Sequence, residues 1–133
     1  MAHAVSVGTL DHFNIRTRKL DETVRFYRDV LGLTSGPRPN FSFPGAWMYA
    51  DGRAVVHLVD ISPTQEPQKP DSGVVHHVAF VSRGFAAMRA HLETAGVPFD
   101  IRQVPGGDLW QIFVRDPNGV MVELNYTVAD EQG

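Results

Sequence analysis

Three histidines and one glutamate stand where imidazole and carboxylate groups could bind a metal ion. His12 and His77 each come directly before a short alternating stretch, "FNI" and "VAF", while His57 and Glu123 lie inside the apolar stretches "AVVHLVD" and "VMVELNY". Imidazole and carboxylate suit divalent Fe, Zn, Ni, Mn or Co, and two histidines with one carboxylate form the set used by oxygen-activating iron. The sequence has no cysteine, so thiolate ligands, disulfides and a cysteine nucleophile are excluded.

These four residues recur at a nearly constant spacing. His12 and His77 are 65 residues apart, and "VHL" around His57 is followed 66 residues later by "VEL" around Glu123. This repetition predicts a tandem duplication, in which each half is too small to bury its own sheet face and needs the other half.

Both halves show the same predicted order of one strand, one helix and three strands. Apolar residues alternate in the strands and follow helical spacing in the helices, and a glycine stands after the end of each helix. In the first half the strand 10–17 precedes a helix over 21–31 and strands at 40–43, 46–50 and 54–60. In the second half the strand 75–81 precedes a helix over 84–95 and strands at 97–104, 108–115 and 120–126.

We therefore expect one α+β domain over residues 1–133, made of two tandem βαβββ repeats. The first repeat covers about 8–61 and the second about 74–127, and the polar, proline-rich segment 62–73 reads as a linker. Each apolar sheet face needs its own helix, so the polar faces should curl into an open, mixed β-sheet barrel with the helices outside.

Successive strand side chains point to opposite faces, which sorts the candidate site residues. By this alternation the candidate metal ligands His12, His57, His77 and Glu123 share the inward face. A single strand histidine is more often structural, and Glu123 could instead pair with an arginine such as Arg16. Candidates for substrate contact are Asn14, Trp47, Tyr49, Trp110, Phe113, Met121 and Asn125, although about half of such aromatic residues simply belong to the core. Arginines that could hold an anionic substrate, but are more commonly surface residues, are Arg38, Arg53, Arg102 and Arg115.

Composition narrows the class of protein. A formal charge of −3 with interspersed charges gives no basic stripe for nucleic acid. We find no signal segment and no apolar run long enough to cross a bilayer, so a soluble cytoplasmic protein is the expectation. Glycine-rich nucleotide motifs, a nucleophile elbow and HExxH are also missing from the sequence.

The motifs "LDHFNI", "FYRDVLGL", "HHVAF", "RDPNG" and "VELNY" resemble those of the vicinal oxygen chelate superfamily over about residues 8–127. That superfamily includes glyoxalase I, methylmalonyl-CoA epimerase, extradiol dioxygenases, fosfomycin-resistance enzymes and bleomycin-binding proteins. The resemblance implies two βαβββ units around one divalent metal ion, a homodimer, and His12, His77 and Glu123 as ligands. Related isomerases usually carry Glu or Gln where this chain has His57.

The resemblance implies three functions. The first is a metal-dependent isomerase or lyase of the glyoxalase and epimerase type, acting on a small carbonyl substrate through a metal-bound enediolate, with Glu123 moving protons. The second is an extradiol-type dioxygenase with a His, His, Glu iron site. The third is a metal-free binding protein of the bleomycin-resistance type, which the retained ligand-type residues argue against.

Overall fold

Alternating apolar residues build two four-stranded mixed sheets in the computed structural model, which describes residues 5–131. The first half contains β1 (Phe13–Thr17), α1 (Leu20–Arg25), the π-helical turn η1 (Phe26–Val30), β2 (Thr34–Gly36), β3 (Gly45–Ala50) and β4 (Arg53–Asp60). The second half contains β5 (His77–Val81), α2 (Phe85–Ala95), β6 (Asp100–Gln103), β7 (Leu109–Arg115) and β8 (Met121–Thr127), followed by the short α3 (Val128–Glu131).

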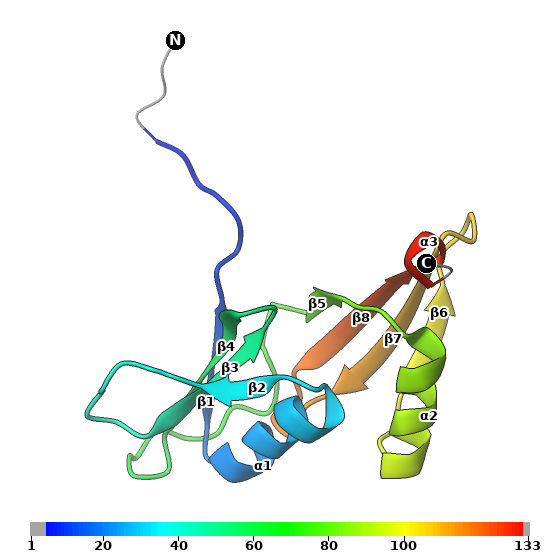
Figure 1. Ribbon diagram of the computed structural model, residues 1–133. Coiled ribbons are helices and arrows are strands. Elements are labelled where there is room, and N and C mark those ends of the chain that lie inside the picture. The colour runs from blue at the N-terminus through cyan, green and yellow to red at the C-terminus, as the bar shows by residue number, and fades with distance from the viewer. Residues whose placement is uncertain (1–4, 132–133) are drawn as a thin grey trace.

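The two halves have the same strand order. The sheets run β1-β4-β3-β2 and β5-β8-β7-β6, with the first and last strand of each half parallel and the other neighbours antiparallel. Figure 1 shows the sheets side by side, with α1 against the first sheet and α2 beside the second. The predicted α+β class and the βαβββ repetition are confirmed, and the barrel is open.

One predicted strand is in the wrong place. The sequence predicted a strand at 40–43, whereas β2 is Thr34–Gly36 and residues 40–43 belong to a loop. Pro37, Pro39 and Pro44 surround that loop, and proline cannot donate to a strand ladder. β2 therefore pairs with β3 before the first of these prolines.

The core lies on the helix-facing side of both sheets. Val56 and Leu58 on β4, and Val122 and Leu124 on β8, are all buried. The alternating position between each pair, His57 or Glu123, therefore faces the other side of its sheet. Among residues 5–131, no helix has both the length and the apolar character that crossing a membrane requires.

The turn between β7 and β8 docks on the first half through a buried polar network. Asn118 accepts a hydrogen bond from Thr17 Oγ1 (2.6 Å) and donates one to Thr23 Oγ1 (3.0 Å). The Tyr27 hydroxyl donates to the Asp116 carboxylate at 3.0 Å. Burial raises the pKa of Tyr27 well above its usual value, and Asp116 adds to this effect. This network joins residues about 100 positions apart and so ties the two halves together.

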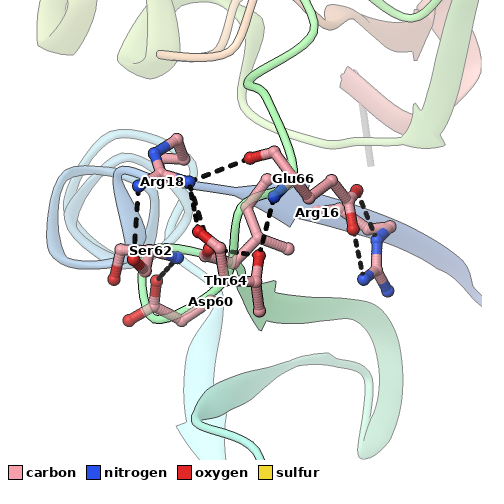
Figure 2. Close-up of polar contacts among 7 residues, drawn as sticks. Arg16, Arg18, Asp60, Ser62, Thr64 and Glu66 are labelled. Atoms are coloured by element: carbon pink, nitrogen blue, oxygen red, sulfur yellow. Dashed lines mark hydrogen bonds and ion pairs between the residues drawn. The ribbon is translucent and has the colours of Figure 1, made fainter.

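Two arginines, Arg16 in β1 and Arg18 directly after it, hold the first part of the segment 62–73 (Figure 2). Arg16 makes a bidentate ion pair with Glu66, at 2.6 and 2.7 Å. The Arg18 guanidinium donates to four backbone carbonyl oxygens at 2.9–3.2 Å, those of Ile61, Ser62, Thr64 and Glu66. Hydrogen bonds from side chains to the backbone, rather than a strand ladder, hold this segment in place. Its sequence therefore needs no alternation of apolar residues.

Candidate metal site

The first pair of candidate ligands lies on the first sheet. The parallel register of β1 and β4 places Asn14 opposite His57. His12 lies two residues before Asn14 and therefore on the same face. The ring of His12 stacks on that of His57, with centroids 3.6 Å apart and planes at 10°. Trp47 stacks on the other side of His57, with ring centroids 3.9 Å apart.

Both imidazoles are also bonded to the protein through one ring nitrogen. His12 Nδ1 contacts Asp11 Oδ2 at 2.6 Å, while His57 Nε2 donates to the Ala54 carbonyl oxygen at 3.0 Å. Each imidazole therefore has one nitrogen tied to the protein and one left over.

Electrostatics favour the neutral form of His57. Burial lowers the pKa of this imidazole, and the neighbouring His12 lowers it further. A neutral imidazole is the form that binds a metal ion. A ligated ion lies near the ring plane, and two nearly parallel planes do not converge on one point. For His12 and His57 to bind the same ion, one ring must turn from the position seen here.

The second pair lies on the second sheet. β5 and β8 are parallel, with His77 opposite Met121 and Ala79 opposite Glu123, which puts His77 and Glu123 on one face. His77 Nε2 lies 3.4 Å from Glu123 Oε1, and Glu123 is only 8% exposed.

The surroundings of Glu123 suit a cation. Within residues 5–131 its carboxylate has no lysine or arginine partner, and Arg16, the alternative partner considered above, pairs with Glu66. Burying a carboxylate is costly unless a cation or hydrogen bonds compensate it. The donor set of one carboxylate and several imidazoles fits a divalent metal ion.

A single chain does not bring the four candidate ligands together. Over the described range 5–131, no three His, Asp or Glu side chains lie close enough to hold one ion. The structure instead forms two separate pairs, His12 with His57 and His77 with Glu123. The pairs occupy equivalent positions in the two repeats.

The candidate substrate residues are divided between the two sheets. Phe113 and Met121 line a cavity of about 330 Å³ beside His77 and Glu123, and Asn125 lies on the same face of β8, where it accepts a hydrogen bond from Gln111 at 3.2 Å. We call this space the β5–β8 cavity.

On the first sheet, Trp47 stacks on His57 and the Tyr49 hydroxyl donates to the Pro37 carbonyl oxygen. Asn14 lines a different cavity, also of about 330 Å³, between β1, the segment 62–73 and β5.

Trp110 lies on the helix-facing side of the second sheet. Its ring contacts Phe85 of α2 at 5.4 Å between centroids, and it is paired in register with the buried Tyr126. The sequence held the signal, because Trp110 and Phe113 are three positions apart on one strand and must face opposite sides. Trp110 therefore faces away from the candidate metal ligands.

Five further residues line the β5–β8 cavity: His76, Asp100, Ile101, Arg102 and Gln111. Among them the sequence had pointed to Arg102, as an arginine that could hold an anionic substrate. Asp100 and Arg102 come from β6, where Asp100 pairs with Phe113 and Arg102 with Gln111. Strand alternation alone would have placed Asp100 and Arg102 on a common face, but their register against β7 was needed to show which face it is.

The chain folds into two βαβββ units, each of which brings two imidazole or carboxylate side chains together on the polar face of its sheet. The sequence profile of the Glyoxalase/Bleomycin resistance protein/Dioxygenase superfamily matches residues 9–124. The chain belongs to this superfamily, which confirms the resemblance found in the sequence.

Individual relatives agree with this assignment. The chain is 29% identical over 120 residues to Glyoxylase I 4 of Arabidopsis thaliana, covering 87% of this chain and 69% of that protein. It is 29% identical over 129 residues to lactoylglutathione lyase of Haemophilus influenzae, covering 92% and 95%. A glyoxylase/bleomycin resistance protein/dioxygenase domain from Frankia sp. EAN1pec has the same fold, with a TM-score of 0.72, 19% identity and coverage of 92% and 93%.

Proposed function

We propose that this protein is a divalent-metal-dependent isomerase or lyase that acts on a small carbonyl substrate. The observation that carries the proposal is the buried Glu123 carboxylate, held 3.4 Å from His77 with no lysine or arginine of residues 5–131 paired to it. The proposed ligands are His12, His57, His77 and Glu123, with His57 joining when its ring turns away from the stack.

We also propose that two copies of the chain complete the site. His12 and His57 would come from one copy, and His77 and Glu123 from the other, because one chain holds only the two separate pairs. Large apolar side chains that precede the candidate ligands in the chain are exposed, namely Leu10 before His12, and Val74 and Val75 before His77. An isologous dimer would give a surface of this kind a partner and would create two equivalent sites.

The residues of the chain have distinct roles in this proposal. A bound divalent ion would supply Lewis-acid polarisation of a substrate carbonyl. Glu123 would then accept and return the proton of the neighbouring carbon at a carboxylate oxygen, which is the general-base role. Phe113 and Met121 would contact the substrate on one side, and Trp47 with Tyr49 would do so from the other half-site. Closure of these apolar walls would keep bulk water from the transferred proton.

The first assay tests the activity for which the relative from Haemophilus influenzae, a lactoylglutathione lyase, is named. The protein is loaded separately with Fe, Zn, Ni, Mn or Co and tested for formation of lactoylglutathione from methylglyoxal and glutathione. We expect turnover with at least one metal and loss of turnover with a chelator. Protein that retains none of these ions would instead be the metal-free binding protein.

The stacked geometry favours a second candidate function, the extradiol-type dioxygenase. As placed, only one of the two parallel rings, His12 or His57, can direct a nitrogen at a given ion. Together with His77 and Glu123 this gives two histidines and one carboxylate, the set that non-haem iron oxygenases use. Catechol-dependent oxygen uptake by the Fe(II)-loaded protein, without lactoylglutathione formation, would select this function.

Mixing two inactive variants tests whether the site is shared. His12→Ala and Glu123→Ala should each fail to retain metal. After unfolding and joint refolding, about half of the dimers are mixed, and in each of these one site receives both lesions while the other is intact. The mixture should therefore recover roughly one quarter of the wild-type metal content. Recovery of none, with dimers present, would place the whole site within one chain.

A further inference from the structure

The β5–β8 cavity holds a cation that the proposed metal chemistry does not use. Arg102 reaches into it from β6, and its guanidinium carbon lies 5.6 Å from the centroid of the Phe113 ring. Within residues 5–131 this guanidinium makes no hydrogen bond or ion pair. The ring contact holds it over the cavity by a cation–π interaction and leaves its N–H groups available.

Three other arginines of the chain are already engaged. Arg16 pairs with Glu66, Arg28 with Asp29 and Arg89 with Glu93. A guanidinium presents N–H groups in a fork that matches a carboxylate in a bidentate manner. Arg102 therefore differs from these arginines in offering its fork to a ligand, beside two proposed metal ligands.

With a divalent ion bound, the charges around the cavity would favour an anion. Two carboxylates, Asp100 and Glu123, line it together with Arg102. A divalent ion held by Glu123 would balance both carboxylates, so the guanidinium would be the remaining net charge. Asp100 lies two residues from Arg102 on the same strand face but is not within ion-pair distance of it.

Two amides lie next to Arg102 on this face, Gln111 in the lining of the cavity and Asn125 hydrogen-bonded to it. Gln111 is the register partner of Arg102, and its Nε2 donates to Asn125 Oδ1. That bond fixes both amides and leaves the Asn125 NH₂ group free to donate. An anionic group next to Arg102 would thus have a guanidinium fork and a neutral donor on the same face.

We propose that Arg102 is a specificity-determining residue that binds a carboxylate of the substrate while the substrate's carbonyl oxygens face His77 and Glu123. The substrate class is then a carbonyl compound that also carries a carboxylate, such as an oxo acid, rather than a neutral ketone or aldehyde. This inference rests on the proposed metal-dependent function and adds the substrate's charge to it.

Two matched chelators test the proposal by binding alone. Succinate monohydroxamate and butyrohydroxamate share a metal-chelating hydroxamate, and they differ in whether the chain ends in a carboxylate or a methyl group. Calorimetric titration of Co(II)-loaded wild-type protein should show about tenfold tighter binding of the carboxylate probe, the size of a charge-assisted hydrogen bond at an accessible site.

Variants assign the preference to this side chain. Arg102→Gln should bind both probes alike, with the affinity for butyrohydroxamate unchanged, whereas Arg102→Lys should keep part of the preference because it keeps the charge. Arg89→Gln makes the same chemical change on the exposed surface of α2 and should behave as wild type. Melting temperatures of all variants, measured in parallel, show whether each is folded.

The outcomes separate the two proposals. If butyrohydroxamate does not bind the Co(II)-treated wild type, the metal site is absent and both proposals fail. If both probes bind wild type equally, or if Arg102→Gln keeps the full preference, the role of Arg102 is overturned while the metal site stands.

Discussion

Glu123→Gln is expected to weaken the binding of a divalent metal ion by at least about 100-fold, because loss of a direct ligand should exceed the 10–100-fold cost of losing an outer hydrogen-bond partner. The amide has nearly the same shape as the carboxylate but carries no charge, so His77 would be left without its anionic neighbour 3.4 Å away. Equilibrium dialysis against Zn(II), followed by metal analysis, measures the effect. Glu93→Gln, at an exposed helix position paired with Arg89, is the matched control and should keep wild-type affinity.

The same variant should have the opposite effect on the metal-free protein. Glu123 is 8% exposed and has no lysine or arginine partner within the described part of the chain. Burying an amide costs less than burying an unpaired carboxylate, so the melting temperature of the metal-free variant should equal or exceed that of wild type. A purely structural Glu123 would instead lower the melting temperature and leave metal binding unchanged, which would end this site assignment.

Asn118→Ala is expected to destabilise the protein by about 3 kcal/mol, the range for breaking a buried hydrogen-bond network. The side chain of Asn118 accepts from Thr17 and donates to Thr23, and all three residues are buried. Truncation would leave the two hydroxyls without this partner and would open a small void at the junction of the repeats. Urea unfolding, followed by circular dichroism, gives the change in free energy.

A second asparagine provides the control for that measurement. Asn40 is exposed, in the loop that precedes β3, and Asn40→Ala should change the free energy of unfolding by less than about 0.5 kcal/mol. If Asn118→Ala costs under about 1 kcal/mol, near the net value of a single exchanged hydrogen bond, the network does not hold the repeats together as described. The turn would then be a passive connection between β7 and β8.

The alternation of side chains was predictable because it is a local property of a strand. Val56 and Leu58 enclose His57, just as Val122 and Leu124 enclose Glu123, and this pattern alone predicted which residues leave the core. The duplicated order of elements followed from the same periodicities. Local signals failed at 40–43, where alternating phenylalanines resembled a strand although prolines on both sides prevent one from pairing.

The sequence by itself determined that three imidazoles and a carboxylate stand at repeat-equivalent positions on the polar side of two sheets. Only the tertiary structure decided their pairing, because the parallel registers of β1 with β4 and of β5 with β8 place His12 beside His57 and His77 beside Glu123. The tertiary structure also places Arg102 in the same cavity as His77 and Glu123. Register and the placement of one sheet against another depend on packing between residues far apart in the chain, which local alternation does not encode.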